Sequence, residues 1–283
     1  MIKSNFILRA DTPIAHHSET MGNMSVLMRE LVRCEDGELV RVPIITGDAM
    51  RNRIRSEVGN LLLSSILDDG DKISAEAIRF IFSGGVLAGK QAHHSVKSWI
   101  EAVRCWPGLG LLGGCCNGRI WPGALKVDDA VMLCSETKHL AVESHRDENT
   151  KSCRAYIEEV QRVRMDPANN PQFESIQVKT EYGDDISLMP RSFEQACRGS
   201  LWIWSMTLVS DDKLLEDLLK AAMMPLLSGK FTVGGKTATG HGRMSMVSAE
   251  ITAADSVEAR TRVTSHMKAN KEDAIAYLKE VIA

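Results

Sequence analysis

Residues 201–209 (LWIWSMTLV) constrain the fold of this chain more than any other segment, because they predict a strand with large apolar side chains on both faces. Trp202 and Trp204 lie on one face, and Leu201 and Ile203 lie on the other. A strand of this kind belongs in the middle of a sheet whose two faces are both covered. The chain must therefore build a sheet around this segment.

Periodicity and capping residues predict the elements around that sheet. A helix is expected where Thr46 or Asp48 can cap it and where Met50, Ile54 and Val58 recur every four residues. The other predicted elements are a first strand at 4–11, a polar loop from Thr12 to about Pro43, short helices at 73–83 and 95–105, strand-like residues at 124–134, a helix capped by Asp211, and a closing amphipathic helix capped by Asn270.

The region 139–199 differs from the rest of the chain, because it is polar and mixes acidic with basic residues. It holds a predicted helical piece at 152–163, a turn at Asp166–Pro171 and an alternating stretch at 175–182. Turn signals and alternation together predict an inserted arm that contains a hairpin.

Bulk composition describes an ordinary globular protein. The chain has 283 residues, a formal net charge of -3 and 5% aromatic residues, so a binding site would use few aromatic rings and only a local group of cations. The seven cysteines contain no C-x-x-C pair, which favours free thiols in a reducing compartment. No apolar run reaches membrane-spanning length, and we expect a soluble cytoplasmic protein that does not contact a membrane.

The segment Gly229–Arg243 is a glycine-rich loop between a predicted helix and a predicted strand. Glycines let backbone N–H groups approach an anion closely, and the lysines, threonines and arginine in the loop add charge-assisted contacts. The alternative is a flexible connection that binds nothing. A nucleotide-binding role for Lys236 is a further alternative, since Gly235-Lys236-Thr237 ends like a Walker loop, but the glycine spacing is one residue too long and no helix follows.

Two histidine pairs and several acidic residues are candidates for other chemistry. His16-His17 and His93-His94 are adjacent in sequence, and adjacent side chains diverge on a strand or helix. The set His139, Glu143 and His145 is too loosely spaced for a known ligand pattern. We therefore expect neither a metal nor another cofactor, and no nucleophile motif is present.

Arg51, Arg53 and Arg55 face one side of the helix that begins near residue 46. By themselves they are typical of a solvated helix face. Together with Lys236 and Arg243 they are candidates for phosphate binding, because binding of a nucleic-acid backbone requires several separated cations.

The order of these motifs resembles the RAMP superfamily, and within it the Cas-seven-type backbone subunit of CRISPR effector complexes. The resemblance is carried by Pro43–Arg55 (PIITGDAMRNRIR), by Thr239–Met244 (TGHGRM) near the other end, and by Leu109–Gly114 (LGLLGG) between them. Each motif is short, so the resemblance rests on the order of the three motifs along the chain. Within the family, the sequence is most similar to the plasmid-associated type IV version, with type I or type III relatives as alternatives.

The resemblance implies an α+β fold over residues 1–283: a ferredoxin-like palm of the RNA-recognition-motif type, helical fingers at 61–105 and a thumb hairpin insertion at 139–199. It also implies a function in antiviral defence. Copies of the subunit would form a filament along a guide RNA (crRNA) without cleaving it. The expected partners are guide RNA, target DNA or RNA that pairs with the guide, other copies of the chain and other effector subunits.

Carried over residue by residue, the resemblance predicts RNA contacts in two segments, to which we add one histidine. The full set is Thr46, Gly47, Arg51, Arg55, Gly234, Gly235, Lys236, Thr237, Gly240, Arg243 and His17. The aromatic stacking motif of general RNA-recognition domains is missing, so we expect binding through the RNA backbone, with little sequence preference.

An enzyme remains the main alternative to a binding protein. A RAMP endoribonuclease would cut guide precursor or target RNA with His16, His17 or an acid of the first loop, where the candidates are Glu19, Glu30, Glu35, Asp36 and Glu38. None of these acids aligns with the aspartate of the RNA-cleaving type III relatives, and we therefore expect no catalytic residue.

Overall fold

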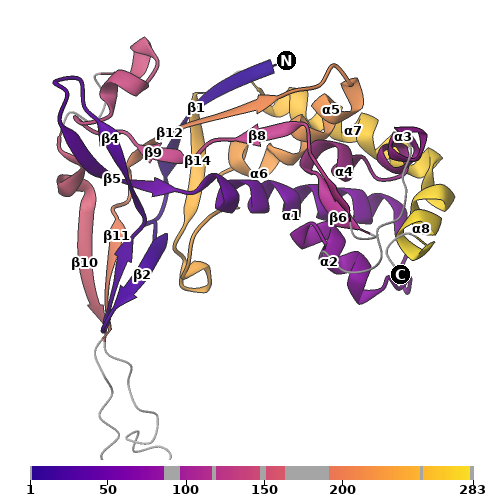
Figure 1. Cartoon of the computed structure of the whole chain (residues 1–283), viewed down its shortest axis with the longest axis horizontal. Coiled ribbons are helices and arrows are strands. Elements are labelled where there is room, and N and C mark those ends of the chain that lie inside the picture. The colour runs from indigo at the N-terminus through magenta and orange to yellow at the C-terminus, as the bar shows by residue number, and fades with distance from the viewer. Residues whose placement is uncertain are drawn as a thin grey trace, which may run out of the picture.

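The computed structural model describes residues 2–85, 96–116, 119–146, 151–162, 191–248 and 251–280. It is elongated, with strands gathered at one end and helices at the other (Figure 1). The helices are α1 (Gly47–Ile66), α2 (Ala75–Ser83), α3 (Val96–Cys105), α4 (Pro107–Leu112), α5 (Lys213–Ala222), α6 (Met224–Leu227), α7 (Ala253–Ala269) and α8 (Lys271–Glu280). Short 3-10 turns are η1 (Lys138–Leu140), η2 (Glu143–His145), η3 (Cys153–Tyr156) and η6 (Thr237–Thr239).

The main sheet has eight strands in the order β13-β14-β1-β12-β9-β5-β4, with β8 also paired to β12. Its described pairings are antiparallel. The strands are β1 (Ile2–Ala10), β4 (Arg29–Arg33), β5 (Leu39–Ile45), β8 (Leu125–Val127), β9 (Ala130–Met132), β12 (Leu201–Leu208), β13 (Phe231–Thr232) and β14 (Arg243–Ser248). Helix α1 lies in sequence between β1 and β9, and helix α5 lies between β12 and β14.

A second sheet has the order β10-β11-β3-β2 and consists of β10 (Ile157–Arg162), β11 (Arg191–Ala196), β3 (Met24–Leu27) and β2 (His17–Met21). Strands β10 and β11 pair antiparallel, as an arm with a hairpin requires. The turn at 166–171 and the alternation at 175–182 lie outside the described residues, and so do His93 and His94. A third sheet pairs β6 (Gly114–Cys116) with β7 (Arg119–Trp121).

The prediction of a central strand at 201–209 is confirmed, because β12 lies between β1 and β9 in the sheet. Trp202 and Trp204 are 1% and 0% exposed in the main core, and the Trp204 ring lies 5.3 Å from that of Phe6. On the opposite face, Leu201 packs in a small second cluster with Ile7 and its neighbours. Each large apolar side chain buried in this way contributes about 1.5–3 kcal/mol.

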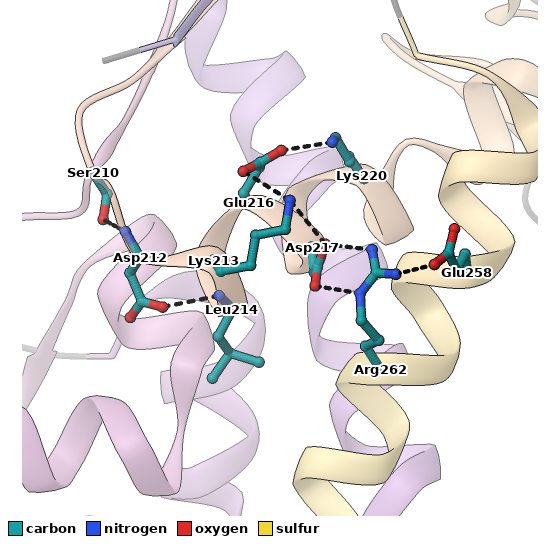
Figure 2. Close-up of polar contacts among 9 residues, drawn as sticks. All are labelled: Ser210, Asp212, Lys213, Leu214, Glu216, Asp217, Lys220, Glu258 and Arg262. Carbon is teal, nitrogen blue, oxygen red and sulfur yellow. Dashed lines mark hydrogen bonds and ion pairs between the residues drawn. The ribbon is translucent and has the colours of Figure 1, made fainter.

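Helices α1 and α7 both pack against α5, and an ion pair between a buried carboxylate and a partly exposed guanidinium joins α5 to α7. Asp217 is 3% exposed and accepts hydrogen bonds from Arg262 Nε at 2.7 Å and Nη2 at 2.8 Å, as Figure 2 shows. Burial without this partner would be costly for a carboxylate, so the two-pronged contact fixes the register of the two helices.

Three predictions of secondary structure were wrong. The polar loop expected from Thr12 to Pro43 contains strands β2, β3, β4 and most of β5. The described polar and charged residues of these short strands are exposed or half-buried, so the segment resembles a loop in the sequence. The helix expected at 152–163 is instead η3 followed by β10, because pairing with β11 outweighs local helix preference.

The third error concerns a helix cap. Helix α5 is capped by Asp212, whose carboxylate accepts the Leu214 amide, and not by Asp211. The predicted closing helix is confirmed as α8: Asn270 directly precedes it, and the Asn270 carbonyl accepts the Ala274 amide. Asn270 also ends helix α7, which the sequence analysis did not predict. The expected cap of α1 is confirmed, since the Thr46 side chain accepts the Ala49 amide.

Candidate nucleic-acid interface

The glycine-rich loop is anchored at both ends on the segment that follows β1. The Gly235 amide donates to the Ala15 carbonyl at 2.7 Å, and the Gly242 amide donates to the Pro13 carbonyl at 2.9 Å. A Cβ atom on Gly242, whose φ is +86°, would lie 2.1 Å from the Val233 carbonyl oxygen. Only glycine fits that position. The tip of the loop, residues 234–240, is exposed.

The tip presents Lys236 and then the single 3-10 turn η6. Lys236 has a φ of 58°, in the left-handed region, which costs a non-glycine residue about 1 kcal/mol or more. Its ammonium lies 3.9 Å from the centroid of the Phe193 ring, a cation–π contact that offsets this cost. Thr237 and Gly240 are exposed beside it, and Gly240 has open space around its Cα.

Phe193 of β11 is the centre around which the site is built. The ring is 2% exposed, and the rings of His17 and His241 meet it edge-on at centroid distances of 6.0 and 6.2 Å. The guanidinium of Arg162, on the paired strand β10, lies 5.6 Å from its centroid. The loop thus rests beside the four-stranded sheet (Figure 1). The cationic groups of Lys236 and Arg162 both lie close to the Phe193 ring.

Arg243, at the end of the loop, is a further exposed cation. Its backbone is fixed on both sides, because its amide donates to Thr12 Oγ1 at 2.9 Å and its carbonyl accepts the Asp11 amide at 2.9 Å. Its side chain has no hydrogen-bond or ion-pair partner among the described residues. Arg191, opposite Arg162 in the β10–β11 register, adds another exposed positive charge.

The start of α1 lies next to the loop, through the segment that both contact. His16 follows Ala15, and its Nε2 accepts the Thr46 amide at 3.3 Å, while the Gly47 amide donates to Asp129 Oδ1 at 2.6 Å. The two segments predicted to bind RNA therefore do lie side by side. The amides of Thr46 and Gly47, however, are already engaged within the protein.

Arg51 and Arg55 point away from the loop and hold the end of α4. Both guanidinium groups donate to the Leu112 carbonyl, at 2.7 and 2.8 Å, and each reaches a second carbonyl: Leu125 for Arg51 at 2.5 Å and Gly113 for Arg55 at 3.0 Å. Burial lowers the pKa of both groups, that of Arg55 to about 10 with a further contribution from the Arg51 charge. The fold uses these arginines to satisfy carbonyls at a helix C-terminus.

Comparison with known proteins finds similarity among solved structures. No protein-family model matches the chain, and no curated protein matches it. Among solved structures, it is similar to a chain described as "Type IV-B CRISPR Complex", with a TM-score of 0.59 and 18% sequence identity. The alignment covers 89% of this chain and 92% of that chain.

The chain has the fold of a CRISPR complex component. At this level of identity the match shows the fold alone, an α+β arrangement with a curled antiparallel sheet, and it leaves the role of individual residues open.

Electrostatics within the site agree with the geometry. Burial lowers the pKa of His241, and the nearby cations Arg162 and Lys236 lower it further. Burial and the neighbouring His17 lower the pKa of His16. Both rings are therefore neutral at pH 7, and the positive charge of the face comes from lysine and arginine.

Sequence analysis missed two central members of the site, Phe193 and Arg162. Both lie in the inserted arm, where no motif marked them. The sequence feature that could have indicated this site is Phe193 itself, because it is the one large apolar residue in the polar run Arg191–Ala196 (RSFEQA). Its partners depend on strand pairing across more than thirty residues, which a single sequence does not reveal.

Within the described parts of the chain, no group of three His, Cys, Asp or Glu side chains could hold a metal ion. None of the described helices combines the length and apolarity that a bilayer crossing requires.

Proposed function

We propose that this chain binds single-stranded guide RNA as a repeating, non-catalytic subunit of a CRISPR ribonucleoprotein complex. The observation that carries the proposal is the convergence of exposed cations from two distant segments, the glycine-rich loop and the β10–β11 arm, on one face around Phe193. The structural match to a chain described as "Type IV-B CRISPR Complex" supports the proposal that the chain acts within such a complex.

The proposed contacts are to RNA phosphates. Lys236, Arg162 and Arg243 supply charge, and Thr237 and Gly240 leave hydroxyl and backbone groups accessible at the loop tip. The aromatic ring of the site is buried and already covered by cations, so it is unsuited to base stacking. Binding would then be tolerant of sequence, and base pairing would read the target.

The proposed architecture is a ferredoxin-like palm over residues 1–283 with two insertions. Its support is the strand order β14-β1-β12-β9, with α1 and α5 as the two connecting helices, which is the order of a β-α-β-β-α-β unit. The region 61–105, with α2 and α3, would be the fingers, and 139–199, with β10 and β11, would be the thumb. Arg51 and Arg55 are left out of the proposed interface because they hold α4.

The non-catalytic part of the proposal is supported by the two histidines that could perform acid–base work. His16 Nε2 accepts the Thr46 amide, and His17 Nε2 donates to the Glu194 carbonyl at 2.8 Å. Both rings thus have internal structural roles. Incubation of labelled RNA with the protein, with and without a divalent metal, should leave the RNA intact.

The binding test uses fluorescence anisotropy with two labelled single-stranded RNAs of unrelated sequence, over a range of salt concentrations. The variants are Lys236→Ala, Arg162→Ala and Arg243→Ala. We expect each variant to bind both RNAs more weakly and to lower the salt dependence, log Kd against log salt, by about one unit per lost phosphate contact.

Lys268→Ala is the matched control, because Lys268 is an exposed lysine on α7 with no partner among the described residues. It should bind like the wild type. If all three interface variants kept the wild-type affinity and salt dependence, the proposed interface would be refuted. If the variants weakened the binding of only one of the two RNAs, sequence-tolerant binding would be refuted.

A further inference from the structure

Two buried cysteines lie together where the arm leaves the main sheet. Cys134 follows strand β9 and is 0% exposed, and Cys153 begins the turn η3 that leads into β10 and is 3% exposed. Both are free thiols. Strands β9 and β10 belong to the strand-rich end of the molecule (Figure 1). We call this pair of cysteines the arm dithiol.

Hydrogen bonds hold the two segments of the arm dithiol against each other. The Ser135 amide donates to the Lys151 carbonyl at 3.0 Å. The Glu136 carboxylate accepts the Cys153 amide at 3.0 Å and the Ser152 hydroxyl at 2.5 Å. Each of these contacts crosses from the segment after β9 to the segment before β10. The two cysteines therefore cannot move apart unless several hydrogen bonds break.

The two thiols are chemically unequal. A hydrogen bond from the Cys134 thiol lowers the pKa of Cys153, although burial opposes this effect. The same contact raises the pKa of Cys134, and burial raises it further. Cys134 is also within 3.3 Å of the Thr137 hydroxyl. Because the thiolate is the reactive form of cysteine, Cys153 is the nucleophile of the pair and Cys134 holds the proton.

A third free thiol, Cys34, lies between β4 and β5 and is half-buried. Burial raises its pKa, and the carboxylates of Asp36, Glu136 and Glu38 raise it further. Cys34 therefore stays protonated and is a poorer nucleophile than Cys153. It provides a matched control, because it is a cysteine outside the arm dithiol.

We propose that the arm dithiol is a redox modification site, at which a peroxide oxidises Cys134 and Cys153 to a disulfide that fastens the arm to the main sheet. Disulfides of proteins in reducing compartments are mostly transient and redox-sensing, which agrees with free thiols as the resting form. The proposal goes beyond RNA binding and does not depend on it.

The reaction uses one peroxide as a two-electron oxidant. The Cys153 thiolate, whose proton has passed to solvent, attacks one peroxide oxygen, the O–O bond breaks, and Cys153 becomes a sulfenic acid. The hydroxide that leaves takes the Cys134 proton and becomes water. The Cys134 sulfur then attacks the sulfenic sulfur, the S–S bond forms, and a second hydroxide leaves and takes a proton from solvent. Two thiols and one hydrogen peroxide thus give one disulfide and two waters.

The disulfide would close a loop of chain between β9 and the arm. Such a cross-link stabilises a protein chiefly by restricting the unfolded chain. For a loop of this length in a protein of this size, we expect the melting temperature to rise by roughly 5–10 °C.

Peptide mapping of the whole chain tests the proposal. The folded protein is exposed to hydrogen peroxide, the remaining thiols are alkylated after denaturation, and a protease digest is analysed by mass spectrometry. We expect a linked pair of peptides that joins Cys134 to Cys153 and that dithiothreitol separates. The oxidised wild type should melt roughly 5–10 °C above the reduced protein, and dithiothreitol should reverse the shift.

Two variants sharpen the test. Cys34→Ser should form the same linked pair as the wild type, with the same shift in melting temperature. Cys153→Ser should form no linked pair and show no shift, and its circular dichroism spectrum reports whether it folds. The mapping of the wild type and of Cys34→Ser decides the proposal even if Cys153→Ser does not fold.

The proposal would be overturned if peroxide left Cys134 and Cys153 as free thiols in the folded protein. A disulfide from Cys34 to either of them would also overturn it, and so would oxidation of Cys153 to a sulfinic acid without a linked pair. A linked pair that forms only in urea would show that the folded structure does not bring the two thiols together for this reaction.

Discussion

Arg55→Ala should destabilise the fold and leave RNA binding intact. Its guanidinium donates two hydrogen bonds, to the carbonyls of Leu112 and Gly113, and both of these residues are buried. A hydrogen bond from a charged donor contributes about 1.5–3 kcal/mol, and the half-buried position of Arg55 favours the lower value. We therefore expect the variant to lose about 2–4 kcal/mol in the free energy of unfolding.

Arg51→Ala should have a similar effect, and the two substitutions should not be additive. Both side chains donate to the Leu112 carbonyl, so either single variant leaves that acceptor satisfied. Each single variant also relieves repulsion between the two cations, which is seen in the pKa of Arg55. The double variant should therefore lose more than the sum of the single losses, by roughly 1 kcal/mol.

Urea unfolding at neutral pH, followed by tryptophan fluorescence, measures these effects. Asn52→Ala is the control on the same helix, because Asn52 is exposed, and it should stay within about 0.5 kcal/mol of the wild type. The reasoning fails if Arg55→Ala is as stable as this control and instead lowers the salt dependence of RNA binding. That result would make Arg55 a phosphate ligand, as the family resemblance implies.

Three further predictions concern the loop, a histidine and the ion pair between helices. Gly242→Ala should displace the glycine-rich loop, because its Cβ would meet a backbone carbonyl, and weaken RNA binding together with the protection of the loop from proteolysis. The pKa of His16 is lowered and its Nε2 accepts the Thr46 amide, so urea stability should fall as pH drops below about 6.5, and less so in His16→Gln. The pKa of Asp217 is lowered chiefly by its hydrogen bonds from Arg262, so stability from this pair should be present above about pH 4 and lost at lower pH, a loss that Asp217→Asn should lack.

Much of the secondary structure followed from local signals. Strand β12 could be recognised from its apolar residues on both faces, and α1 from a threonine cap and a four-residue apolar period. The loop Gly229–Arg243 could be recognised as a place for close backbone approach, and Gly242 shows why glycine is needed there. These features depend on neighbours in sequence, so one sequence is sufficient to predict them.

The tertiary structure alone decided which cations share a face. Arg51 and Arg243 look alike in sequence, yet Arg51 donates to the buried carbonyls of Leu112 and Leu125, whereas Arg243 is exposed. Phe193 and Arg162 entered the site only because β11 and β10 pair and bring them to the loop tip. The sequence by itself determined the central strand, the capped helix and the presence of a glycine-rich loop. Long-range pairing and burial, which depend on residues far apart in the chain, determined the function that each arginine can perform.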